Sequence, residues 1–259
     1  AGIEPRFESW EDFWNKLDQL KASGISYPVC METAGNGWTS SLMLGGFIAG
    51  KSPEGFDFMN APFPTDYNHG FVKEGILDTV RLLKDYAAPG SVGGDYANAE
   101  GHFMREESAL LINGSHFSDP SLGVDESFAE KIVPIPFPGD IIYKSAHYGS
   151  TICSTDKEHA DAAWKFLRMM CDRESQTMLM LYSGELPDDA SISITQEIAE
   201  KYPILAVAYE QFASSPSIEG FSRIWNSAVG EELASGYPAI MYDTMTADEL
   251  VDRLNSVAQ

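Results

Sequence analysis

Residues 45–52 match a pattern that binds phosphate in other proteins. The stretch Gly-Gly-Phe-Ile-Ala-Gly-Lys-Ser fits the spacing G-x-x-x-x-G-K-[ST]. In a phosphate-binding loop a strand leads into this segment and a helix follows it, so that backbone N–H groups surround the phosphate. Here Pro53 and Gly55 follow at once, which disfavours a long helix beginning at Lys51. Phe47, Ile48 and Ala49 have the apolar character of a helix face, so the stretch predicts a helix rather than a nucleotide site.

Other combinations of reactive residues are better explained without catalysis. Residues 154–157, Ser-Thr-Asp-Lys, fit the S-x-x-K spacing of serine acyltransferases, but the companion K-T-G is absent, and a Ser or Thr here is expected to cap the next helix. The five histidines are scattered, and acidic pairs such as Glu106–Glu107 are adjacent, so in a helix they would point about 100° apart. The triplet 113–115, Asn-Gly-Ser, is a glycosylation acceptor only in a eukaryotic secretory context. The sequence therefore predicts no catalytic residue, no metal site and no cofactor.

The composition excludes several classes of partner. With 39 acidic and 17 basic residues the formal charge is −22, and this negative potential repels nucleic acid and anionic lipid. No run approaches the ~20 apolar residues of a membrane span, and the first residues do not form a signal peptide. The protein is therefore expected to be cytoplasmic or to have had its export signal removed. Each of Cys30, Cys153 and Cys171 lies among apolar residues, which predicts three buried, unpaired thiols.

Strands and helices are expected to alternate, which is typical of an α/β fold. Helical spacing of apolar residues predicts helices near 9–23, 38–49, 71–86 and 160–170, with a mostly helical remainder after 187. Short apolar runs predict strands at 25–31, 108–114 and 148–153, whereas the prolines within 51–67 predict irregular structure there. Trp10, Trp14 and Trp164 lie on apolar helical stripes and are expected to serve packing.

Four segments, taken in order, carry a family resemblance. Residues 8–25 begin Glu-Ser-Trp-Glu-Asp-Phe, similar to T-W-[ED]-E-[FL]; residues 103–116 resemble F-x-x-G-K-A-A-M-x-x-x-G-x-W, with Glu107 and His116 as departures. Residues 135–138, Ile-Pro-Phe-Pro, resemble a P-x-P run, and residues 161–167 with 184–187 resemble an A-A-W-x-F-L helix and a G-x-x-P turn. This set resembles the family of extracellular solute-binding proteins that includes the maltodextrin-binding protein. The resemblance implies a periplasmic-binding-protein-like type II α/β fold that captures a carbohydrate for an ABC importer without being an enzyme.

The resemblance also implies where a mono- or oligosaccharide would be held. Trp38 lies where the family places a ligand-facing aromatic residue, directly after the loop that carries Asn36. His116 stands at the position of a stacking tryptophan, and Asn113 and Ser115 are hydrogen-bonding candidates beside it. The remaining candidates are Arg223, which would bind a hydroxyl or an acidic sugar, Trp225, which faces either cleft or core, and Tyr148.

The lobes implied by the resemblance divide the chain in three. Residues 1–138 form the first part of a C-terminal lobe, residues 139–190 a return segment of an N-terminal lobe, and residues 191–259 the helices that complete the C-terminal lobe. The first strands and helices of the family have no counterpart here, so the implied partners are the solute, a transporter permease, and a missing N-terminal lobe or second chain. The return segment is expected to pack against a neighbouring copy or to stay partly exposed.

The implied location is extracellular or periplasmic, with tethering as a lipoprotein in the full-length form. Two other classes stay open. One is an α/β hydrolase that acts on saccharides through an acidic pair, and the other is a protein-interaction module that docks its acidic face on a basic partner.

Overall fold

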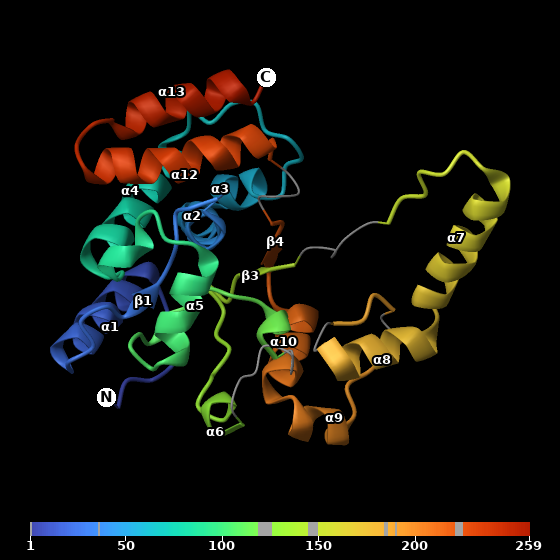
Figure 1. Cartoon of the computed structure of the whole chain (residues 1–259). Coiled ribbons are helices and arrows are strands. Elements are labelled where there is room, and N and C mark those ends of the chain that lie inside the picture. The colour runs from blue at the N-terminus through green and yellow to red at the C-terminus, as the bar shows by residue number, and fades with distance from the viewer. Residues whose placement is uncertain are drawn as a thin grey trace. The chain divides into compact units, whose positions relative to one another are not determined.

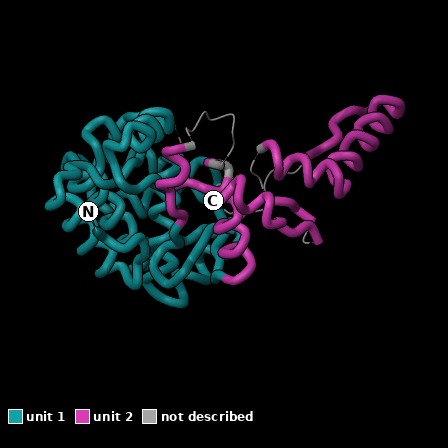
Figure 2. Tube along the Cα trace, turned by 90° about the horizontal axis from the view of Figure 1, so that it is seen from below, with its two compact units in different colours: residues 1–112, 135–145, 215–259 teal, residues 113–134, 146–214 magenta. Residues whose placement is uncertain are grey.

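The computed structural model describes residues 2–35, 37–118, 126–144, 150–183, 186–189, 191–220 and 225–259. The chain forms two compact units, drawn in different colours in Figure 2. Unit 1 comprises residues 1–112, 135–145 and 215–259, and unit 2 comprises residues 113–134 and 146–214. The chain therefore leaves unit 1 and returns to it twice.

In its described residues unit 1 is mainly helical, with four very short strands (Figure 1). Its helices are α1 (Trp10–Ala22), α2 (Trp38–Lys51), α3 (Pro53–Phe58), α4 (Gly70–Asp85), the 3-10 turn η1 (Pro89–Ser91), α5 (Tyr96–Met104), α12 (Ser227–Met241) and α13 (Ala247–Val257). Its strands form two parallel pairs. In the first, β1 (Val29–Cys30) pairs with β2 (Leu110–Leu111), and in the second, β3 (Ile142–Tyr143) pairs with β4 (Ser217–Ile218).

Helix α2 lies at the centre of the unit 1 core. Every residue from Thr39 to Ala49 is buried, as expected of a helix that is apolar on all sides and covered by its neighbours. α2 packs on α3, α4 and α12, and α13 covers α12 and α4 (Figure 1). Its glycines permit close packing: a Cβ on Gly45 would lie 2.0 Å from the Tyr143 hydroxyl oxygen. That hydroxyl donates to the Leu42 carbonyl oxygen at 2.7 Å, so β3 is fixed directly against the helix.

Unit 2 has a small core of its own. Its described helices are the 3-10 turn η2 (Ser115–Ser118), α6 (Glu126–Ala129), α7 (Lys157–Met170), α8 (Arg173–Ser183), α9 (Gln196–Lys201) and α10 (Pro203–Ser214). Buried Met180, Ile198, Tyr202 and Leu205 link α8, α9 and α10, and the Tyr202 hydroxyl donates to the Leu181 carbonyl oxygen. No strand lies among the described residues of unit 2.

Most predicted helices are confirmed, with longer or shorter bounds. Ser9 caps α1, because its hydroxyl accepts a hydrogen bond from the Asp12 N–H at 3.1 Å. The expectation of irregular structure over 51–67 is wrong in part, since α3 forms there. Ser52 caps α3 by accepting from the Gly55 N–H, and Pro53 occupies the first helical position, where its missing N–H costs nothing.

The strands are shorter than predicted, and two packing expectations fail. The strand predicted over 148–153 begins outside the described residues, and residues 150–153 are not in a strand. Cys30 is buried, but Cys153 and Cys171 are exposed, so the prediction of three buried thiols is wrong for two. Trp10 and Trp14 do pack against the unit 1 core, whereas Trp164 on α7 is 57% exposed. Unit 2 offers α7 no buried position within the described part of the chain.

Candidate functional site

The loop between β1 and α2 places one of the predicted ligand residues. β1 ends at Cys30, and α2 begins at Trp38 after an N-cap at Gly37. Gly37 has φ +54° and ψ 53°, a left-handed conformation that favours glycine. Its lack of a side chain also leaves the start of α2 without a cap from the N-cap residue itself. Another residue must therefore satisfy the exposed N–H groups of the helix.

Glu32 supplies that cap from the preceding segment. Its carboxylate accepts a hydrogen bond from the Thr39 N–H at 2.8 Å and a second from the Thr39 hydroxyl. In return, the Glu32 N–H donates to the Thr39 hydroxyl oxygen at 3.0 Å, and the Ser40 hydroxyl donates to the Glu32 carbonyl. Glu32 is only 2% exposed. Burial raises the pKa of its carboxyl group, and the hydrogen bonds from Thr39 oppose that shift.

A second loop holds the same segment from the other side. The Thr33 N–H donates to the Ser91 carbonyl at 3.1 Å, and the Ala34 N–H donates to the Gly94 carbonyl at 3.0 Å. The Thr33 hydroxyl accepts from the Gly93 N–H at 2.9 Å. Because residues 32–34 are hydrogen-bonded on both sides, this segment is held in place by the protein itself.

Trp38 forms an aromatic pair with Tyr96 at this loop. The ring centroids lie 5.5 Å apart at an interplanar angle of 67°, an edge-to-face contact. Both side chains are half-buried, and the Tyr96 hydroxyl donates to the Glu100 carboxylate at 3.2 Å. The site therefore combines two aromatic surfaces with a hydroxyl and a carboxylate.

Sequence reasoning missed Tyr96, although a signal for it exists. Tyr96 is the first residue of α5 and follows Gly93, Gly94 and the N-cap Asp95, whose side chain accepts from the Asn98 N–H. Trp38 likewise opens a helix directly after a glycine-rich loop. The same pattern at two places in the chain could have pointed to both aromatic residues.

The other predicted ligand residues are not assembled around Trp38 by the described structure. Asn36, Tyr148 and Arg223 lie outside the described residues, as does the side chain of His116. Asn113 and Ser115 belong to unit 2, both half-buried, and the Asn113 side-chain oxygen accepts from the Gly114 N–H at 2.8 Å.

Trp225 lies in the core of unit 1. It is 3% exposed, and its ring packs against Tyr67 at 5.4 Å and Phe58 at 6.2 Å between centroids. Of the two orientations considered for it, cleft or core, the structure shows the core. We therefore leave Trp225 out of the proposed site.

The phosphate-loop and S-x-x-K patterns have structural explanations. Residues 45–51 belong to α2, as predicted, so their N–H groups serve the helix and do not surround a phosphate. The S-x-x-K segment ends at Lys157, the first residue of α7, but the predicted Ser or Thr cap is wrong: the N-cap is Asp156, whose side chain accepts from the His159 N–H at 2.9 Å. Within the described residues, no cluster of His, Cys, Asp and Glu is placed to hold a metal ion.

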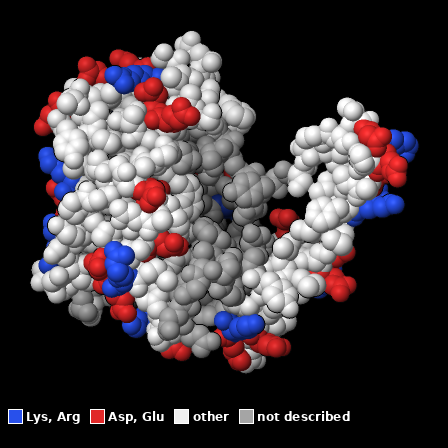
Figure 3. All heavy atoms as spheres, in the orientation of Figure 1, with Lys and Arg blue, Asp and Glu red and all other residues white. Residues whose placement is uncertain are grey.

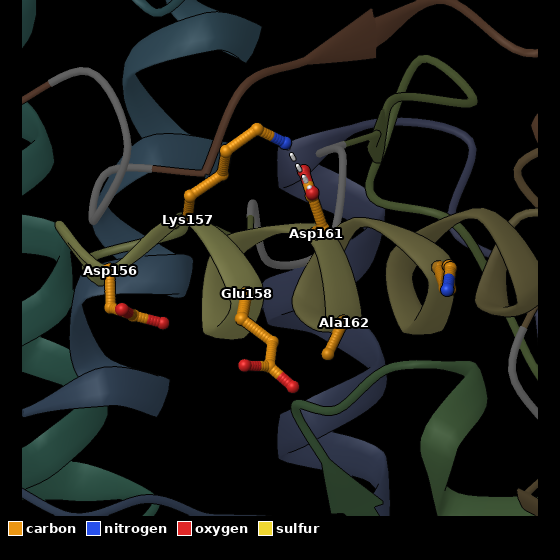
Figure 4. A pocket seen from close by; sticks show the side chains of 6 residues that line it. Asp156, Lys157, Glu158, Asp161 and Ala162 are labelled. Carbon is orange, nitrogen blue, oxygen red and sulfur yellow. Dashed lines mark hydrogen bonds and ion pairs between the residues drawn. The ribbon is translucent and has the colours of Figure 1, made fainter.

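A shallow surface hollow on α7 does not resemble a binding site (Figure 4). It is lined by Asp156, Lys157, Glu158, Asp161, Ala162 and Lys165. All six are exposed, and the Lys157 ammonium already pairs with the Asp161 carboxylate at 2.6 Å one helical turn away. Exposed pairs of this kind contribute little energy and confer little specificity.

In the part of the chain that the structure describes, no helix is long and apolar enough to cross a membrane.

Several solved structures that are longer than this chain share its fold. A Streptococcus pneumoniae solute-binding protein in complex with the blood group A-trisaccharide has a TM-score of 0.80 at 16% identity, over 99% of this chain and 65% of that one. A chitin oligosaccharide binding protein has a TM-score of 0.74 at 20% identity, over 97% and 64%. Maltose-bound MalE3 of T. maritima has a TM-score of 0.72 at 13% identity, over 99% and 66%. The chain thus spans about 65% of the length of the first of these structures.

These likenesses show the fold, which is periplasmic-binding-protein-like, as the sequence predicted. A search of curated proteins gave no match. The family profile of bacterial extracellular solute-binding proteins, however, matches residues 1–177, which is more than half of the chain. The chain therefore belongs to the family of bacterial extracellular solute-binding proteins.

Proposed function

We propose that this chain is the larger part of a solute-binding component of an ABC importer and that its solute is a carbohydrate. The observation that carries the proposal is the pair of half-buried rings, Trp38 and Tyr96, held at the start of two helices by pre-formed loops. Family membership supports solute binding, and several structural relatives bind sugars.

The chemistry of the Trp38 site suits a sugar. Pyranose rings present apolar C–H faces that pack on aromatic side chains and hydroxyl edges that need hydrogen-bond partners. Trp38 and Tyr96 supply the aromatic surface, while the Tyr96 hydroxyl and the Glu100 carboxylate supply polar partners on α5. Because the loops are already hydrogen-bonded, little conformational entropy is lost when a ligand binds.

The proposed mechanism needs no covalent chemistry. Two lobes close on the sugar about a hinge, and the transporter permease recognises the closed form. The protein acts outside the cytoplasm, and its full-length form is tethered to the membrane as a lipoprotein. In this scheme residues 1–138 and 191–259 contribute to the C-terminal lobe and residues 139–190 to the N-terminal lobe. The buried carboxylate of Glu32 acts as a helix cap, because both of its oxygens are bonded to Thr39.

The test is a thermal-shift and calorimetric screen against mono- and oligosaccharides. We expect weak or undetectable binding by the 259-residue chain, since about a third of the length of the relatives is not spanned. A version extended by the sequence encoded upstream is expected to bind one sugar class and to be stabilised by it, because a ligand that binds only the native state raises its stability. In that version Trp38→Ala or Tyr96→Ala should weaken binding at least tenfold, or about 1.4 kcal/mol.

The matched control is Tyr242→Ala. Tyr242 is a 63% exposed aromatic residue of the same unit, outside the loops that carry Trp38 and Tyr96, so its removal should leave the affinity unchanged. Sugar binding that survives the loss of both Trp38 and Tyr96 would move the site elsewhere. Silence of the extended protein towards every sugar would reject a carbohydrate as the solute.

A further inference from the structure

The two segments that build the Trp38 site carry carboxylates and no lysine or arginine. Residues 22–50 and 85–104, which include the loops before α2 and α5, contain neither of these basic residues. They contain four carboxylates, those of Glu32, Asp85, Asp95 and Glu100. The aromatic pair locates the site, and these carboxylates set the ligand charge that it favours.

Two of the carboxylates lie on or next to α5 beside the aromatic pair. Glu100 is half-buried one helical turn after Tyr96, on the same face of the helix, and accepts a hydrogen bond from the Tyr96 hydroxyl at 3.2 Å. Asp95 directly precedes Tyr96 and caps α5 by accepting from the Asn98 N–H at 3.0 Å. The charge of Asp95 also reaches the loop before α2, since it raises the pKa of Glu32. Its charge therefore acts at both loops of the site.

Two basic residues that border these segments are already paired. Arg105, which follows α5, donates to the Glu107 carboxylate through two nitrogen atoms, each at 2.9 Å. Lys51 lies at the opposite end of α2 from Trp38, about 20 Å along the helix, and pairs with Asp78 at 2.6 Å. On the face drawn in Figure 3, several Lys and Arg side chains likewise lie beside Asp or Glu. Neither Arg105 nor Lys51 is therefore placed to neutralise an acidic ligand at the site.

The two aromatic rings suit a positively charged group. Because the rings of Trp38 and Tyr96 meet at 67°, their faces form a corner and not a parallel stack. The faces of aromatic rings carry negative partial charge, so they attract an ammonium group placed against them. The Glu100 carboxylate lies at the Tyr96 hydroxyl, where it offers the same ligand a charge-assisted hydrogen bond. A ligand that carries a carboxylate gains neither interaction.

We propose that the Trp38 site selects an amino sugar with a free ammonium group over neutral sugars and discriminates against sugars that carry a carboxylate. This inference rests on the proposed carbohydrate function and narrows its substrate class. The C–H face of the sugar packs on one ring, and its ammonium group lies against the second ring and the Glu100 carboxylate. The overall charge of −22 adds a long-range attraction for such a cation. Arg223, the candidate for an acidic sugar, lies outside the described residues, and the described segments favour the opposite charge.

The experiment compares three trisaccharides that differ only in the substituent at C2. Each consists of β-1,4-linked pyranose units with an ammonium, an N-acetyl or a hydroxyl group at that carbon. Calorimetry with the extended protein of the sugar screen, below the pKa of the sugar amine, should show about tenfold tighter binding of the ammonium form than of either other form. This advantage should shrink as salt is added, because ions screen the charges. It should also shrink as the pH rises through the pKa of the sugar amine, because the ligand then loses its charge.

Variants that remove one charge identify the carboxylates responsible. Glu100→Gln keeps an oxygen for the Tyr96 hydroxyl, and Asp95→Asn keeps a good N-cap for α5, so each removes charge with little change of shape. Each should lower the ratio of the ammonium-form affinity to the hydroxyl-form affinity severalfold. The control Glu11→Gln removes the same charge from an exposed position on α1, outside both loops, and should leave that ratio unchanged.

The outcomes separate the charge of the ligand from its chemical class. Equal or tighter binding of the hydroxyl or N-acetyl form would overturn the selection of an ammonium group and leave carbohydrate binding intact. A preference that survives both Glu100→Gln and Asp95→Asn would overturn the role of these carboxylates. Binding of the linear polyamine spermidine without binding of any sugar would reject the carbohydrate function and, with it, the amino sugar. Silence towards all four ligands would reject both as well.

Discussion

The buried carboxylate of Glu32 offers the sharpest test of how the loop before α2 is held. We consider two substitutions. Glu32→Ala removes both hydrogen bonds that the carboxylate accepts from Thr39, one of which caps the N–H of the second residue of α2. Glu32→Gln keeps a carbonyl oxygen for the Thr39 N–H and turns an NH₂ group towards the Thr39 hydroxyl oxygen.

The expected magnitude for Glu32→Ala follows from these contacts. Loss of a helix cap costs about 1 kcal/mol, and a buried donor left unsatisfied adds about 1–3 kcal/mol. We expect the free energy of unfolding of unit 1 to fall by about 3 kcal/mol. For a unit of this size, that change lowers its melting temperature by about 6–12 °C.

The pH dependence distinguishes Glu32→Gln from the unchanged protein. Because burial raises the pKa of Glu32 above its ordinary 4.5, the folded state binds more protons than the unfolded state between 4.5 and the raised value. The stability contributed by the protonated carboxyl group is therefore present below 4.5 and is lost as the pH rises through the raised pKa. A glutamine side chain does not titrate, so the stability of Glu32→Gln relative to the unchanged protein should increase with pH through this window and then level off.

The assay is chemical denaturation followed by tryptophan fluorescence and circular dichroism at a series of pH values. The negative charge of Asp95 raises the pKa of Glu32 further. Asp95→Asn should therefore lower that pKa and narrow the pH range over which the two proteins differ in stability. A stability difference between the unchanged protein and Glu32→Gln that stays constant across pH would refute burial as the dominant influence. An alanine variant as stable as the glutamine variant would refute the capping role.

Three further predictions concern other parts of the chain. Gly55→Ala should lower the free energy of unfolding by about 1–3 kcal/mol or more, because the new Cβ would lie 2.2 Å from the carbonyl oxygen of Ile48 in α2. The control Gly70→Ala, which has open space around the new Cβ, should leave the melting temperature unchanged or slightly higher. Arg105→Ala should raise the pKa of Glu107 from about 2 towards 4.5 in an NMR titration, since the guanidinium is the larger of its two stabilising partners. Cys30 should stay unlabelled by maleimide until the chain is unfolded, and rapid labelling of the native protein would contradict its burial.

Local patterns in the sequence determined the helices of this protein. The spacing of apolar residues located α1, α2, α4 and α7 to within a few residues, because this signal repeats with every helical turn. Pro53 and Gly55 argued against a phosphate-binding loop at residues 45–52, and residues 45–51 are indeed part of α2. The family was also recognisable from the order of four short segments.

Only the tertiary structure decided which apolar faces are covered. Trp14 and Trp164 both lie on helical apolar stripes, yet Trp14 stacks on Phe47 in the unit 1 core and Trp164 is exposed. An apolar stripe predicts that one face of a helix packs against other residues, but those residues come from distant segments that periodicity does not identify. For the same reason the contact of Trp38 with Tyr96, which lies far along the chain, and the bonds of Glu32 to Thr39 required the folded chain.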